Sequence, residues 1–174
     1  AVRADAYVFC GFPRLLAPPV LALARRGGLI LHPGRLPDER GPAPLFWALK
    51  AGRTEVGWTL HVLDRGEDTG DVVATGALAF EPGARGLEIL EEVALAAAPA
   101  LVRGLRGLLE GDLVRSPQGP PKTPRGPRPG FRDGRIDPGR PAEAIYVFVR
   151  GCAGRYPLFV ESAGDRFFVE DAVS

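Results

Sequence analysis

Several features that often decide a protein's class are scarce in this sequence of 174 residues. Methionine is absent, and the two cysteines, Cys10 and Cys152, stand far apart. They offer no metal-ligand spacing, so we expect two buried free thiols rather than a disulfide, and no metal site. No apolar run is long enough to span a bilayer, and there is no cationic leader with an apolar core. A cytoplasmic protein with no membrane partner is therefore expected.

An excess of charge of one sign is also missing. The 22 basic and 21 acidic residues leave a formal net charge of +1. This balance does not indicate a nucleic-acid partner, although the Arg-rich tract between residues 115 and 140 keeps tRNA open. With 45% hydrophobic residues, the chain can bury one core and carry a small appendage.

The order of apolar and Pro/Gly-rich segments predicts an α/β core. Residues 6–11 are apolar throughout, which favours a strand covered on both faces. A helix starting at Pro18 and carrying Val20, Leu21, Leu23 and Ala24 separates it from a second strand at 29–31, so these two strands should be parallel. Further along, the patterns predict a helix at 43–50, strands at 56–63 and 72–80, and an amphipathic helix at 86–110. Pro99 should kink or divide that last helix.

The last third of the chain has a different composition. Residues 116–130 contain six prolines and predict an extended linker or a strap across the surface. A helix at 141–150 and a hairpin at 158–170 follow. We therefore expect a truncated doubly wound, Rossmann-like α/β core at 1–115, a linker at 116–130 and a small C-terminal domain of helix plus hairpin at 131–174.

Two polar residues stand where strands end, which is where open α/β sheets place their chemistry. His32 follows an apolar strand and precedes Pro33. Asp68 lies in an acidic turn at 64–71, whose spacing does not match an EF-hand and so argues against calcium. His61 stands within a predicted strand, and we interpret it as structural.

Motifs spread over most of the chain resemble the formyltransferases that use 10-formyltetrahydrofolate. They are Leu-Ile-Leu-His-Pro at 29–33, Arg-Gly-Pro-Ala-Pro at 40–44, Gly-Trp-Thr-Leu-His at 57–61 and Asp-Thr-Gly-Asp-Val at 68–72. The segment 10–16 resembles the family's folate-site loop. Segments 133–137 and 144–150 resemble the entry to the C-terminal domain of methionyl-tRNA and sugar-nucleotide N-formyltransferases.

The resemblance implies a catalytic Asn, His and Asp that stabilise an oxyanion and relay protons as an amine attacks the formyl carbon. The His corresponds to His32 and the Asp to Asp68. The Asn position holds Ile30, which cannot donate a hydrogen bond, and the usual Ser after His-Pro is Gly34. In the family, about two further βα units precede the region that resembles this chain. The implied folate-binding residues are Arg14, Leu15, Leu16, Arg65, Gly66 and Glu67.

The leading hypothesis is transfer of a formyl group from 10-formyltetrahydrofolate to an amine of a small metabolite or a sugar nucleotide. One alternative is a repurposed His/Asp site that catalyses another reaction, such as deformylation. Another is a binding or partner subunit, in which a homodimer or a complementing chain supplies the missing half.

Overall fold

The computed structural model describes residues 4–12 and 14–173. Within them, one sheet has four strands in the order β1-β2-β3-β4: β1 (Tyr7–Cys10), β2 (Gly28–His32), β3 (Glu55–Val62) and β4 (Val72–Ala79). β1 and β2 are parallel, whereas β3 is antiparallel to both β2 and β4. The predicted α/β class and the predicted parallel pair are therefore confirmed.

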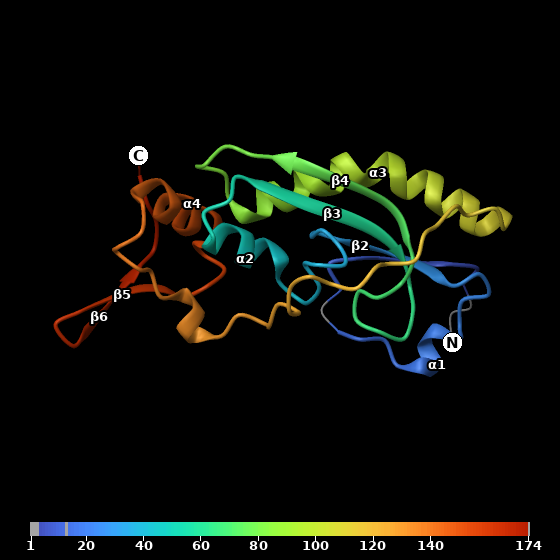
Figure 1. Ribbon diagram of the computed structural model, residues 1–174, viewed down its shortest axis with the longest axis horizontal. Helices are drawn as coiled ribbons and strands as arrows, with labels where there is room; N and C mark the ends of the chain where they lie inside the picture. The colour runs from blue at the N-terminus through green and yellow to red at the C-terminus, as the bar shows by residue number, and fades with distance from the viewer. Residues whose placement is uncertain (1–3, 13, 174) are drawn as a thin grey trace.

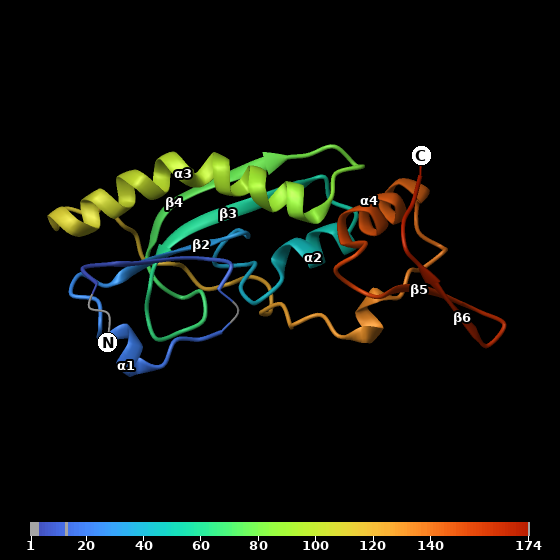
Figure 2. The same ribbon diagram turned by 180° about the vertical axis from the view of Figure 1, so that it is seen from behind.

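The long helix α3 (Gly86–Glu110) covers one face of this sheet (Figures 1 and 2). Its buried residues recur every three or four positions and include Ile89, Val93, Ala97, Ala100 and Gly104. Of the two outcomes expected at Pro99, a kink or a division, the division does not occur. A proline removes only one helical hydrogen bond. The helix stays continuous because buried residues on both sides of Pro99 pack it onto the sheet. The opposite face of the sheet carries His32 and His61.

β1 corrects two expectations. In the described residues it pairs only with β2, and its side chains alternate between half-buried and exposed, so it is not covered on both faces. Both thiols are free as expected, and Cys152 is buried, but Cys10 is exposed. The cause is its place at the sheet's edge, next to a helix α1 (Pro18–Leu21) that is only one turn long. Leu23 and Ala24, expected in that helix, lie beyond it.

The C-terminal elements share one core with the sheet. They are the 3₁₀ helix η1 (Phe131–Gly134), helix α4 (Ala142–Cys152), and strands β5 (Leu158–Ser162) and β6 (Asp165–Val169), which form the predicted hairpin. α4 packs against α2 (Pro44–Lys50), where the Phe46 and Phe148 rings meet edge to face with centroids 5.6 Å apart. The division of the chain into three domains stays a prediction.

Residues 116–130 form no helix or strand and cross the surface from the end of α3 to η1; we call this segment the strap (Figure 1). It starts at Ser116, which exchanges two backbone hydrogen bonds with Val72 at the start of β4. Among the described residues, no helix has both the length and the apolar character needed to cross a membrane.

Candidate active site

His32 ends β2, and its side chain is buried with 6% of its surface exposed. The ring atom Nε2 lies 2.6 Å from the backbone carbonyl oxygen of Glu39. A carbonyl oxygen only accepts, so Nε2 carries the hydrogen and donates it. In the neutral ring, Nδ1 is then the unprotonated nitrogen. Nδ1 faces Oδ1 of Asp68 at 3.6 Å.

The loop that supplies the Glu39 carbonyl is held by β3 and by its own side chains. Thr59, fully buried and directly opposite His32 in the β2–β3 register, donates from its hydroxyl to the carbonyl of Gly34 at 2.8 Å. The same hydroxyl accepts the Leu36 N–H at 3.1 Å. The Glu39 carboxylate accepts the Arg35 N–H at 2.7 Å. These bonds fold the loop back over His32.

Asp68 lies in the loop between β3 and β4 with a φ of 54°. Non-glycine residues in this left-handed region cost about 1–3 kcal/mol and cluster at functional sites. Its Oδ2 accepts the Gly41 N–H at 2.9 Å, and Oδ1 faces the two histidines. The loop therefore delivers one carboxylate to the end of β2, as the sequence predicted for Asp68 and His32.

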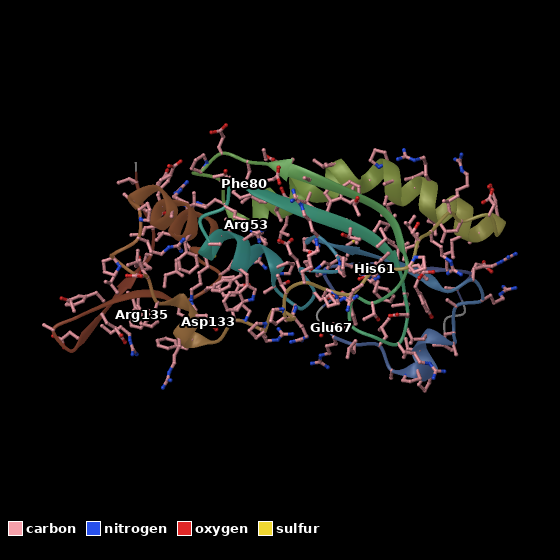
Figure 3. All side chains as sticks on the ribbon, in the orientation of Figure 1. Arg53, His61, Glu67, Phe80, Asp133 and Arg135 are labelled. Carbon is pink, nitrogen blue, oxygen red and sulfur yellow. The ribbon has the colours of Figure 1, made fainter. Side chains whose placement is uncertain are left out.

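His61 joins this pair, which the sequence did not indicate. It lies on β3 beside Ile30 of β2 and is fully buried (labelled in Figure 3). Its Nδ1 donates to the carbonyl of Val62 at 3.0 Å. Its Nε2 has no hydrogen-bond partner and lies 3.7 Å from Oδ1 of Asp68. The pairing of β2 with β3, which turns both rings toward one carboxylate, is not readable from the sequence.

Two ring nitrogens and one carboxylate oxygen therefore converge in a buried space. The lone pair on Nδ1 of the neutral His32 ring faces Oδ1 of Asp68, and this contact becomes attractive once Nδ1 takes up a proton. The cluster is built to receive a proton and to stabilise the resulting positive charge.

Burial and charge act in opposite directions on these groups. Burial lowers the pKa of His32 below its ordinary value and outweighs the opposing effects of the Asp68 charge and the Glu39 carbonyl. Burial works to raise the pKa of Asp68, but the rings of His61 and His32 and the Gly41 N–H outweigh it and hold that pKa below its ordinary value. At neutral pH, His32 is thus an uncharged base next to a carboxylate.

Two positions that depart from the family motif lie beside this cluster. Ile30 is two residues before His32, so both side chains are on the same face of β2, and it pairs with Phe9 on one side and His61 on the other. This half-buried side chain brings an apolar group to the place where the motif has an amide. At Gly34, a Cβ atom would lie 2.8 Å from Nε2 of His32, so the loop needs glycine here.

The expected folate-binding residues come from two segments. Arg14 and Leu15 are exposed and Leu16 is half-buried, between β1 and α1. Arg65, Gly66 and Glu67 immediately precede Asp68. The Gly66 N–H donates to Oδ1 of Asp64 at 3.1 Å, and Arg125 of the strap pairs with the Glu67 carboxylate. The role of these six residues in binding stays a prediction. Among residues 4–12 and 14–173, no group of three His, Cys, Asp or Glu side chains is arranged to hold a metal ion.

Fold and site together define an α/β protein with a buried cluster of two histidines and an aspartate at a strand end. A family model described as formyl transferase matches residues 1–103, which is more than half of the chain. The chain belongs to this formyl transferase family, which confirms the resemblance seen in the motifs.

Individual relatives agree with this assignment. A methionyl-tRNA formyltransferase from Synechococcus sp. (strain JA-3-3Ab) is 35% identical over 150 residues, covering 86% of this chain and 47% of the relative. The chain therefore spans about half the length of that protein.

Solved structures share the fold. A 4-N formyltransferase from Francisella tularensis superposes with a TM-score of 0.76 at 16% identity, over 98% of this chain and 71% of that one. HypX from Aquifex aeolicus, in complex with tetrahydrofolic acid, gives a TM-score of 0.75 at 24% identity, over 93% of this chain and 28% of that one. At these identities the likeness concerns the fold.

Proposed function

We propose that this chain carries the formyl-transfer site of an N-formyltransferase that uses 10-formyltetrahydrofolate and an amine of a small metabolite or a sugar nucleotide. The observation that carries the proposal is the buried cluster itself: an uncharged His32 whose free Nδ1 faces the ionised Asp68. Family membership supplies the reaction class. The tetrahydrofolate in the HypX structure supports the choice of formyl donor.

The chemistry assigned to this chain is proton handling. An amine that forms a bond to a formyl carbon must lose a proton, and His32 Nδ1 is the free base that takes it up. The bond from the formyl carbon to the donor nitrogen then breaks, and that nitrogen receives a proton in return. The Glu39 carbonyl holds the other ring nitrogen in its protonated form. Asp68, 3.6 Å away, stabilises the imidazolium that results.

The formyl donor supplies an activated one-carbon group. The residues that the motifs assign to holding it lie in the two segments 14–16 and 65–67. Of these, 65–67 directly precede Asp68 in the chain, so the residues assigned to folate binding and to proton transfer share one loop. The fit is incomplete at residue 30, because Ile30 provides no donor to the formyl oxygen.

The test is binding of a folate analogue, measured by calorimetry and by thermal shift. We expect binding to the wild type and weakened binding to Asp68→Ala, because the substituted loop loses its contact with Gly41. The matched control is Asp71→Asn, which changes a carboxylate three residues away that pairs at 3.5 Å with Arg115. Its binding should equal that of the wild type. No binding of the analogue to the wild type would contradict the proposal.

Ile30 supports a second candidate. A site with a His/Asp cluster but without the amide donor also suits a repurposed reaction such as deformylation, or a homologue that acts as a binding or partner subunit. Release of formate from 10-formyltetrahydrofolate in the absence of any amine would favour deformylation. Complex formation without turnover would favour the subunit. A homodimer or complementing chain, and the cytoplasmic location, stay predictions.

A further inference from the structure

The strap fastens the two loops that flank the candidate active site. On the loop between β2 and α2, the Lys122 N–H donates to Oδ1 of Asp38 at 2.6 Å, and the Thr123 hydroxyl donates to the Asp38 carbonyl. A further bond runs from the Gly126 N–H to the Arg40 carbonyl at 2.9 Å. The strap thus lies against the same loop that contains Gly34 and Glu39.

At one point the strap approaches the site so closely that only glycine fits. A Cβ atom on Gly41 would lie 2.2 Å from the carbonyl oxygen of Gly126, and Gly41 has a φ of 113°. The N–H of this same Gly41 donates to Oδ2 of Asp68. The strap backbone therefore packs directly behind one of the groups that hold the Asp68 carboxylate.

Gln118 of the strap connects the two loops through its side-chain amide. Its Nε2 donates to the carbonyl oxygens of Asp68 at 3.0 Å and Gly70 at 2.7 Å. Its Oε1 accepts from Nη2 of Arg40 at 2.7 Å. All three partners are thus supplied by the loops, and none by the strap.

The two donated bonds hold the backbone at a strained residue and two residues after it. Among the described residues, Asp68 is one of two non-glycine residues in the left-handed region, and Gln118 bonds its carbonyl and that of Gly70. We propose that Gln118 is a positioning residue of the active site, which holds the Asp68 backbone so that its carboxylate faces both histidines. This inference rests on the proposed function for its catalytic meaning, but the geometry that it describes is testable without turnover.

Loss of Gln118 has a defined electrostatic consequence. Freed from its two bonds, the 68–70 backbone relaxes toward an ordinary conformation, and the carboxylate moves away from His32 Nδ1 and His61 Nε2. Burial and the charge of His61 lower the pKa of His32, whereas Asp68 and, to a smaller extent, Glu39 raise it. Arg125, whose charge also interacts with Asp68, stays in place. The pKa of His32 should therefore fall.

The chain has only two histidines, so both can be followed individually by NMR. We would record the imidazole resonances of the full chain against pH for the wild type, Gln118→Ala and Gln118→Met. The Met variant keeps the length of the side chain and adds no charge, but it loses both donors to the Asp68 loop. Thr123→Val is the matched control, because it removes a strap contact to Asp38 and none to Asp68.

Both Gln118 variants should lower the pKa of His32 by about 0.5–1 unit, part of the ~1–3 units that an opposite charge at this distance contributes. Thr123→Val should leave it unchanged. In a formylation assay, both Gln118 variants should reduce kcat on the order of tenfold. This is less than the ~10²–10⁴-fold contribution of a positioned acid–base group, because the base is kept and only its partner is displaced.

Two results would overturn the inference. One is wild-type titration of His32 in Gln118→Met, which would mean that the two donated bonds do not hold Asp68 in place. The other is an equal fall in the His32 pKa in Thr123→Val, which would mean that the strap acts as a whole. If Gln118→Ala does not fold, the Met variant decides. A protein that shows the expected titrations but transfers no formyl group would refute the proposed function and leave the positioning role standing.

Discussion

Replacing Ile30 by asparagine tests directly whether a hydrogen-bond donor at this position stabilises the formyl oxygen during the reaction. Ile30 lies on the same face of the sheet as His32 and His61. An asparagine there places an amide N–H₂ donor on that face, in the position that the family motif assigns to it. The change supplies a donor without touching the proton-handling cluster.

The expected gain follows from the known cost of losing such a donor. Removal of one oxyanion-hole donor lowers kcat about 10²–10³-fold, or about 2.7–4 kcal/mol. The backbone here is adapted to isoleucine, so we expect only part of this to be recovered: formylation of an amine panel should rise at least about tenfold. Loss of a half-buried isoleucine should cost about 1–2 kcal/mol of unfolding free energy, which is less than the ~1.5–3 kcal/mol for a fully buried aliphatic side chain.

The assay is the initial rate of formylation at saturating 10-formyltetrahydrofolate, with urea denaturation in parallel. Ile30→Val is the matched control, because it removes one methylene group, costs about 0.5–1.5 kcal/mol, and adds no donor. Its formylation rate should equal that of the wild type. If Ile30→Asn folds and its rate does not exceed that of the valine control, the reaction does not use an oxyanion donor at this position, and the reasoning is refuted.

The remaining predictions concern pH and loop packing. Folding lowers the pKa of Asp68 below 3.8, so its ionised form stabilises the protein above about pH 4. That stabilisation is lost as the pH falls through the lower folded pKa. The free energy of unfolding of Asp68→Asn, measured with urea, should therefore depend less on pH below 4. Folding also lowers the pKa of His32 from 6.5, so the unfolded state binds protons first and stability falls as pH drops below 6.5, a slope that His32→Gln should flatten. In Gly34→Ala, the added Cβ atom should displace the His32 ring and cost about 1–3 kcal/mol of unfolding free energy by overpacking. Denaturation should show the lower stability, and formylation should be lost. An unchanged NMR titration of His32 would contradict the displacement of its ring. Thr59→Val removes the buried hydroxyl that bonds Gly34 and Leu36, and denaturation should show a loss of about 1–3 kcal/mol, whereas no loss would mean that the loop is held elsewhere.

The sequence was informative about elements whose signals are local. The amphipathic period of residues 86–110 predicted α3 with its observed bounds, because one apolar face per 3.6 residues is a property of the segment alone. The turn residues 162–165 likewise marked the hairpin. The prediction failed at β1 and Cys10, because an apolar strand reads the same in the middle of a sheet and at its edge, and only the number of neighbouring strands decides its exposure.

The site likewise contains residues that the sequence indicated and residues that only the structure brought to it. Asp68 and His32 were identified from motifs, since each stands next to turn residues whose identity is constrained locally. His61 and Gln118 were not. Nothing in the residues around them shows that β3 lies antiparallel to β2, or that the strap crosses back over the 63–71 loop.

The sequence by itself determined the α/β class, because apolar periods and turn residues are local signals. Its resemblance to known formyltransferases indicated the family and predicted a catalytic role for His32 and Asp68. The tertiary structure alone decided that a second histidine faces the same carboxylate, that Ile30 lies on the site face, and that a glutamine 50 residues along the chain holds Asp68 from behind. The physical reason is that hydrogen bonds and charge interactions act over a few ångströms of space. Contacts between residues distant in sequence exist only once strand pairing and the path of the strap bring them together.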